Sequence, residues 1–294
     1  MNQKVSKNID KKEYLCKICG SSNLLIFENT AKCKNCGILL YYPYPKKDED
    51  IINSGEKKDS FFGEKFDWYA KSSFFNHINF TNMLRYTINK SYTNKEFNIL
   101  DFGGGGGQFA LICKSHFPKA NIYITDIDDD TLLNEWAQYN NQISALEFTN
   151  NTIKFDFIFM NDVFEHLSCP EKVLLTLSEK LRPNGKIFID TPRQFWIYRI
   201  TKLLSKNLYK KLLKANVSLD HLQIWSYRSF RKCILKSNLS ISKYKEVAEF
   251  TMEPEFYLDN MDIKSGFLRY MGKIFYKITL KFLKNKIMCV LEKN

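Results

Sequence analysis

Four cysteines near the start of the chain are spaced as metal ligands. They form two C-x-x-C pairs, namely Cys16, Cys19, Cys33 and Cys36, and a glycine follows each pair. Such glycines permit the tight turn that aims backbone amides at thiolate sulfur. A closed set of four thiolates suits a structural zinc ion, and a segment this small has almost no core without one. Two disulfides would be the alternative, but the chain shows no sign of export and disulfides are disfavoured inside cells.

Five consecutive glycines follow a short apolar run in the stretch FNILDFGGGGGQF, residues 97–109. A glycine-rich turn between a strand and a helix lets a ligand approach the backbone. Gly105, Gly107 and Ala110 fit the dinucleotide pattern G-x-G-x-x-A, and Asp126 follows about 20 residues later. This fingerprint by itself would indicate a nicotinamide or flavin enzyme, but it is too short to decide.

The elements around these glycines alternate between short apolar runs and helical stretches. Strands are predicted over 97–100, 121–127, 155–162 and 186–192, with helices over 108–117, 130–139 and 170–181 and a turn at 182–185. This alternation is typical of a parallel sheet with crossover helices, whose ligands bind at the carboxyl ends of the strands. The polar residues expected there are the glycines, Asp126, Asn161, Asp162, Glu165, His166 and Thr191.

The stretch ILDFGGGGGQF resembles the first motif of class I S-adenosylmethionine-dependent methyltransferases, in which an acid precedes alternating glycines. The segment FDFIFMNDVFEHLSCPEKVLLTLSEKLRPNGKIFIDTP resembles the later part of that fold, with its EH pair after the fourth strand and its PGG-like turn. DHLQIWSYRSFRKCI and KIMCVLEKN resemble the start of the last core helix and the closing strand. The resemblance covers about residues 97–250 and the last ten residues.

The resemblance implies an α/β fold: a Rossmann-like, doubly wound, mostly parallel sheet of the seven-stranded methyltransferase type, preceded by a zinc ribbon. It implies S-adenosylmethionine as cofactor, with Asp126 on the ribose hydroxyls. The cofactor-binding residues expected are Asp101, Gly103, Gly105, Gly107, Asp126 and Asn161. The electrostatics agree, because Asp101 would repel a pyrophosphate but suits the ammonium and sulfonium of S-adenosylmethionine.

Two histidines are candidates for the catalytic base. His166 lies in the loop after the fourth strand, and the resemblance to sugar and small-molecule methyltransferases implies that this position can remove the acceptor's proton. His221, just before LQIWS, can also face the cleft. The competing interpretation is that each imidazole only fixes its loop.

The chain divides by pattern into three parts. Residues 11–45 are expected to form the zinc ribbon, 46–96 a linker and helical segment, and 97–294 the methyltransferase domain. Basic insertions lie near 193–220 and 251–284. The segments 193–219 and 264–294 each carry a net charge of +7, which accounts for the whole excess of +12.

Four interpretations of this basic charge stay open: solvated faces of amphipathic helices, a phosphate-bearing substrate, a membrane surface, or RNA. A ribbon ahead of this core resembles bacterial enzymes of surface-polysaccharide and secondary metabolism. The expected function is therefore methyl transfer to a small acceptor, a sugar or activated sugar. The alternative is an RNA-binding protein or RNA methyltransferase. The polar, lysine-rich residues 1–14 predict a cytoplasmic protein, with contact to the inner face of the membrane as a variant.

Overall fold

The structure is a computed structural model that describes residues 14–44, 76–126, 141–143, 148, 150–194, 221–249, 264–279 and 284–294. Several predicted features lie outside these ranges: the linker at 46–60, the helix over 130–139, most of the first basic insertion and the start of the second. No helix in the described ranges is long and apolar enough to cross a membrane.

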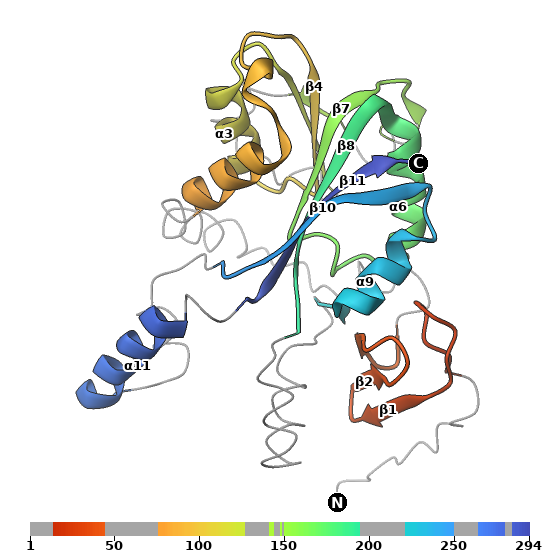
Figure 1. The fold of residues 1–294 in the computed structure, drawn as a ribbon, viewed down its shortest axis with the longest axis vertical. Coiled ribbons are helices and arrows are strands. Elements are labelled where there is room, and N and C mark those ends of the chain that lie inside the picture. Colours follow the sequence, from red (N-terminus) through yellow and green to blue (C-terminus); the bar gives the residue numbers. More distant parts are fainter. Residues whose placement is uncertain are drawn as a thin grey trace, which may run out of the picture.

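A seven-stranded sheet forms the centre of the molecule, in the order β10-β11-β8-β7-β4-β5-β6 (Figure 1). The strands β4 to β8 run parallel to one another, whereas β11 is antiparallel to both β8 and β10. Their bounds are β4 Asn98–Phe102, β5 Asn121–Thr125, β6 Asn141–Gln142, β7 Phe155–Asn161, β8 Leu181–Pro192, β10 Leu239–Val247 and β11 Lys286–Lys293. The predicted mostly parallel, doubly wound sheet is confirmed.

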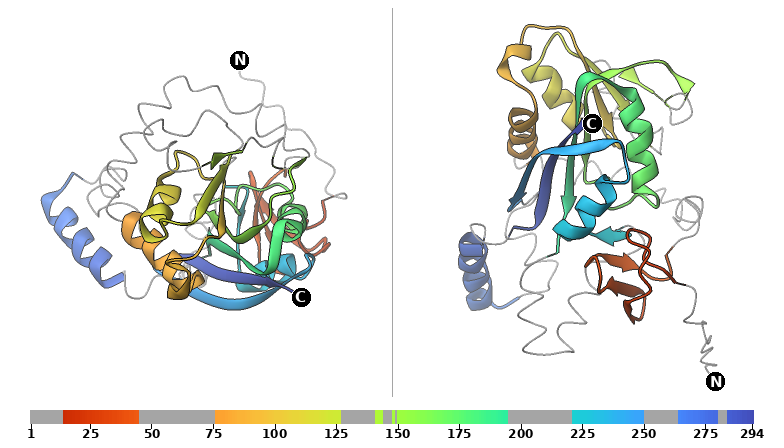
Figure 2. Two further views of the ribbon diagram at one scale, coloured as in Figure 1. Left: turned by 90° about the horizontal axis from the view of Figure 1, so that it is seen from above. Right: turned by 45° about the vertical axis from the view of Figure 1, so that its right-hand side comes forward.

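Helices cover both faces of this sheet (Figure 2). A helix through residues 76–87 and α3, Gln108–His116, pack on one face, where Met83 and Phe109 join a core with Phe159 and Phe188. On the other face α6, Pro170–Lys180, and α9, Tyr227–Ile234, bury Leu174. Their apolar side chains recur at helical spacing, so burial against the sheet stabilises them.

The predicted turn at 182–185 lies inside β8 rather than before it. Leu181 pairs with Phe155 and Lys186 with Phe157, so the four residues between form an outward bulge. A Cβ on Gly185 would approach two backbone carbonyl oxygens to 2.9 Å, so glycine is required there.

A second, four-stranded sheet joins the N-terminal segment to the main body. It has the order β1-β2-β3-β9, with β1 Leu24–Phe27, β2 Thr30–Cys33, β3 Leu39–Tyr41 and β9 Gln223–Ile224. The hairpin of β1 and β2 connects the two cysteine pairs, and β2 ends at Cys33. Its fourth strand comes from late in the chain and begins two residues after His221.

Candidate active site

The glycine loop connects β4 to α3 at the carboxyl edge of the sheet. Gly103, Gly105 and Gly107 have φ values of 76°, 50° and 85°, a region that residues with a side chain rarely adopt. A Cβ on Gly103 would lie 2.5 Å from a methyl of Val163, and one on Gly104 would lie 2.7 Å from Asp101 Oδ2. At least four of the five glycines are therefore needed for backbone conformation or for space.

Asp126, just past the end of β5, closes this loop. Its Oδ2 accepts a hydrogen bond of 2.8 Å from the amide of Gly105. The structure therefore brings Asp126 to the predicted glycines, with one carboxylate oxygen committed to the loop.

Buried polar atoms without a hydrogen-bond partner mark the same edge on three adjacent strands. Among the described residues they include Asp101 Oδ2 on β4, both amide atoms of Asn161 on β7 and Asp190 Oδ1 on β8. The strand register places Asn161 directly beside Asp190. Because buried polar groups are almost always paired, such a row indicates a polar ligand at this edge.

Asp101 has the electrostatics of a cation site. Only 1% of the residue is exposed, and burial, with the nearby charge of Asp126, raises the pKa of its carboxyl to about 8. A cationic ligand group beside the orphaned oxygen would stabilise the ionised form. The ammonium and sulfonium of S-adenosylmethionine fit this requirement.

The two predicted histidines meet beside a buried glutamate. The rings of His166 and His221 lie 5.0 Å apart between centroids. His166 Nε2 is 3.8 Å from Oε1 of Glu165, whose other oxygen accepts a 2.8 Å hydrogen bond from Thr191. Burial, and secondarily Asp162, raises the pKa of Glu165 to about 8. From the sequence, Glu165 is expected at the carboxyl edge of the sheet, but no role is predicted for it.

The Glu165, His166 and His221 ligand atoms all lie within 4.8 Å of one another. Such a set can hold and move a proton near neutral pH, and it can also ligate a divalent cation. The same geometry is therefore compatible with proton transfer and with metal binding.

A buried lysine that the sequence analysis missed ties these elements together. Lys286 Nζ on β11 donates to Asp190 at 2.6 Å, Asp162 at 2.7 Å and Glu249 at 2.9 Å. Burial alone would lower the pKa of Lys286, but the three carboxylates hold it well above its ordinary value. The only signal in the sequence is a lysine directly before the apolar run IMCVL of the closing strand.

Comparison with known proteins agrees with this geometry. The model of a family described as a methyltransferase domain matches residues 69–244, more than half of the chain. The chain belongs to this methyltransferase family.

Relatives of the methyltransferase include O-methyltransferases. The chain is 25% identical over 165 residues to malonyl-[acyl-carrier protein] O-methyltransferase 1 of Ilyobacter polytropus, covering 54% of the chain and 62% of that protein. It is 24% identical over 161 residues to ubiquinone biosynthesis O-methyltransferase of Coxiella burnetii, covering 51% and 67%. The first of these matches spans less than two thirds of the relative's own length.

Solved structures show the same fold. The plantazolicin methyltransferase BpumL, in complex with SAH, superposes with a TM-score of 0.51 at 16% identity, covering 83% of the chain and 94% of that protein. Coclaurine N-methyltransferase, bound to N-methylheliamine and SAH, gives a TM-score of 0.51 at 14% identity, covering 73% and 72%. At these identities the likeness concerns the fold alone.

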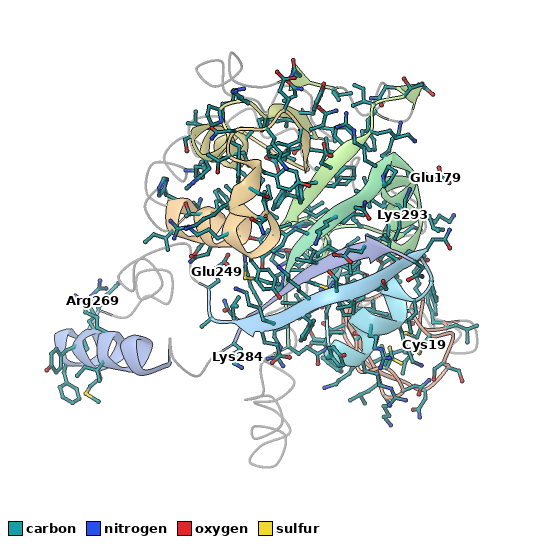
Figure 3. The ribbon with its side chains drawn as sticks, turned by 45° about the horizontal axis from the view of Figure 1, so that its top comes forward. Cys19, Glu179, Glu249, Arg269, Lys284 and Lys293 are labelled. Atoms are coloured by element: carbon teal, nitrogen blue, oxygen red, sulfur yellow. The ribbon has the colours of Figure 1, made fainter. Side chains whose placement is uncertain are left out.

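The four cysteines of the methyltransferase converge at one point, near Cys19 in Figure 3. Cys16 and Cys36 lie 3.6 Å apart between sulfurs, as do Cys19 and Cys33, and none forms a disulfide. Zinc–sulfur bonds of about 2.3 Å require tetrahedral sulfur separations of about 3.8 Å. The backbone amide of Cys36 also donates to the Cys33 sulfur at 3.5 Å. The donor set therefore fits a structural zinc ion.

The cysteine-bearing segment of the methyltransferase supports the loop that carries His166. Tyr44 donates its hydroxyl toward the carbonyls of Leu167 at 3.2 Å and Ser168 at 3.1 Å. Gln223, in the strand that pairs with β3, donates to the carbonyls of Phe164 at 3.0 Å and Leu167 at 2.9 Å. The second half of the histidine loop is thus held by hydrogen bonds from Tyr44 and from the strand next to His221.

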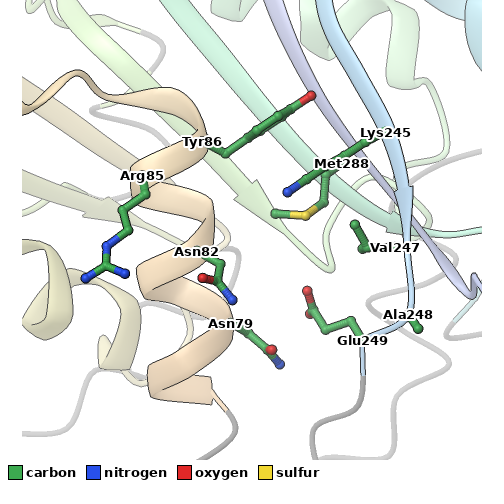
Figure 4. Close-up of a pocket in the computed structure, with 9 residues that line it drawn as sticks. All are labelled: Asn79, Asn82, Arg85, Tyr86, Lys245, Val247, Ala248, Glu249 and Met288. Carbon is green, nitrogen blue, oxygen red and sulfur yellow. The ribbon is translucent and has the colours of Figure 1, made fainter. Parts of the chain in front are cut away.

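A polar pocket of about 370 Å³ opens between the helix through 76–87 and the ends of β10 and β11 (Figure 4). Asn79, Asn82, Arg85 and Tyr86 line it from the helix, and Lys245, Val247, Ala248, Glu249 and Met288 line the other side. Lys245 Nζ lies over the ring of Tyr86, 4.2 Å from its centroid. Through Glu249 and Lys286 the pocket adjoins Asp162 and Asp190.

Proposed function

We propose that this chain transfers a methyl group from S-adenosylmethionine to a small-molecule acceptor. The observation that carries the proposal is the row of orphaned buried polar atoms on Asp101, Asn161 and Asp190, beside a glycine loop with no side chains in the way. The bound cofactor would supply a methyl group activated by its sulfonium. The protein would bind and align the cofactor and the acceptor, and it would remove the acceptor's proton.

Each cofactor-binding residue has a distinct task in this proposal. Asp101 would face the cationic methionine part, and Gly103, Gly105 and Gly107 would admit the cofactor against the backbone. Asp126, whose Oδ2 accepts a hydrogen bond from the Gly105 amide, would also accept one from a ribose hydroxyl. Asn161 would contribute its free amide at the next strand.

His166 is the proposed base and His221 its neighbour in the acceptor site. An imidazole suits the removal of a hydroxyl or carbon-acid proton near neutral pH. Glu165 is buried beside His166 and anchored by Thr191, so it would hold that ring in place. Alignment by the hydrogen-bonded loop supplies the in-line geometry of the displacement.

The proposed acceptor is a sugar or an activated, phosphate-bearing sugar. The polar pocket of Figure 4 supports this choice, because Arg85, Lys245 and two asparagines offer donors suited to phosphate and hydroxyl oxygens next to the acceptor edge. The O-methyltransferases among its relatives are compatible with an oxygen acceptor.

We further propose zinc as the ion of the four cysteines, in a structural role. All four thiolates are used, so the site leaves no open position for substrate. The ribbon would then influence the reaction through the loop that carries His166, which it supports.

Calorimetry with S-adenosylmethionine tests the cofactor assignment directly. The wild-type chain should bind it, and Asp126→Ala should weaken binding by about 1–3 kcal/mol, the usual cost of a lost polar contact. Binding of NAD with no response to S-adenosylmethionine would reverse the proposal. A panel of nucleotide-linked sugars, with methyl-labelled cofactor, then tests the acceptor class, and transfer to RNA alone would refute it.

A further inference from the structure

An amphipathic helix projects from the methyltransferase without packing on its sheet. This is α11, Gly266–Thr279, between β10 and β11 in the sequence. Figures 1 and 2 show it standing apart from the seven strands in each view. The helix is 14 residues long, and its stability cannot come from burial against the sheet.

Large apolar side chains on α11 face solvent. Phe267 is 72% exposed, Tyr270 64% and Met271 45%. The spacing i, i+3, i+4 places the three on one face of the helix, within a single turn. Three adjacent apolar side chains at such exposure are typical of a binding surface rather than of isolated exposed residues.

The charged residues of α11 itself all have one sign. From Lys264 to Lys286 inclusive, the sequence has seven lysines and arginines and no acidic residue. Arg269 and Lys273 lie one turn apart beside the apolar residues, and Figure 3 shows Arg269 extending from the helix. The composition of α11 therefore suits a partner that is anionic as well as apolar.

We propose that α11 docks the enzyme on an anionic membrane surface, lying in the interface with Phe267, Tyr270 and Met271 among the lipids. A bilayer with acidic headgroups offers both an apolar layer and negative charge in one plane, which is what a basic amphipathic helix requires. A nucleic acid would use the cations but leave this apolar face exposed. The inference is independent of the acceptor and of the role of His166.

The experiment is sedimentation of the full chain with vesicles of phosphatidylglycerol, and with vesicles of phosphatidylcholine for comparison. Binding is expected to the anionic vesicles, to weaken with salt, and to be slight for the neutral ones. The combined variant Phe267→Ser, Tyr270→Ser, Met271→Ser should lose at least tenfold in partitioning. Arg269→Gln with Lys273→Gln should also lose about 25-fold, because each of the two basic residues near such a surface contributes about fivefold.

Leu235→Ser with Ile78→Ser is the matched control, since these apolar residues are 68% and 43% exposed elsewhere on the molecule. Unchanged binding of S-adenosylmethionine shows that each variant is folded. The proposal is overturned if the triple variant still sediments with anionic vesicles, or if neutral vesicles bind equally well. It is also overturned if the triple variant only converts a dimer to a monomer, or if the chain binds RNA and ignores vesicles.

Discussion

His166 and His221 face each other in a T-shaped arrangement, with ring centroids 5.0 Å apart and an interplanar angle of 61°. His166 follows β7 and His221 precedes β9, so the two residues are far apart in the sequence. Glu165 Oε1 lies 3.8 Å from His166 Nε2, and the other oxygen of Glu165 accepts a hydrogen bond from Thr191. The ligand atoms of Glu165, His166 and His221 lie within 4.8 Å of one another, so one buried carboxylate lies close to both imidazoles.

The first prediction concerns these imidazoles. His166→Ala should lose about 10²–10⁴-fold in turnover if it is the base, with little change in cofactor affinity. His221→Ala should be the milder change, and His77→Ala, an exposed histidine of the helix through 76–87, should have no effect. Rates are measured with saturating S-adenosylmethionine and an identified acceptor.

If His221→Ala lost more turnover than His166→Ala, the base would be His221. If both variants kept full turnover, alignment of the reactants would be the protein's only contribution to the chemical step. If chelation removed the activity and magnesium or manganese restored it, the cluster of Glu165, His166 and His221 would instead be the site of a hard cation. The four cysteines would not explain that result, because thiolates do not favour hard cations.

The second prediction concerns the support of the histidine loop. Tyr44→Phe removes the hydroxyl that donates toward Leu167 and Ser168, so the loop should lose alignment. Turnover should fall severalfold while the affinity for S-adenosylmethionine stays constant, because the glycine loop is untouched. Tyr41→Phe, in the same segment, is the control. Equal activity of the two variants would show that the hydroxyl has no part in positioning.

The third prediction concerns pH. In the folded chain without ligand the pKa of Asp101 is about 8, against about 3.9 for an unfolded aspartate. The folded state therefore keeps a proton that the unfolded state loses, and stability falls as pH rises between these values, by at most about 1.4 kcal/mol per pH unit. Asp101→Asn should flatten this part of the profile in urea unfolding. A variant whose profile has the wild-type slope would contradict the assignment.

The fourth prediction extends the third to the cofactor. A cationic ligand favours ionised Asp101, so binding near pH 7 should release up to one proton. Calorimetry in buffers of different ionisation enthalpy measures this release, which Asp101→Asn should remove. Release that persists in the variant would point to another group.

The fifth prediction concerns the metal. Protein purified without chelator should contain one zinc ion per chain, and Cys36→Ser should lower that content and destabilise the N-terminal segment. Cys169→Ser, outside the cluster, should leave the metal content unchanged. A zinc content near zero in the wild type would end the assignment.

Much of the site could be predicted from the sequence because its signals are local. The cysteine pairs, the glycines after β4 and the alternation of strands and helices each occupy a short stretch, whose backbone preference or ligand spacing is set by neighbouring residues. Asp101, Asp126 and Asn161 could be placed at the carboxyl edge for the same reason, since every parallel strand ends there.

Only the tertiary structure decided which of these residues meet. The contact of Lys286 with Asp162, Asp190 and Glu249 requires β11 to lie beside β8, and the support of the histidine loop requires β9 to pair with β3. Strand order depends on hydrogen bonds and apolar burial between segments far apart in the chain, to which neighbouring residues give no guide. The sequence therefore determined what lies at the edge of the sheet, and nonlocal pairing determined which groups share a proton or a charge there.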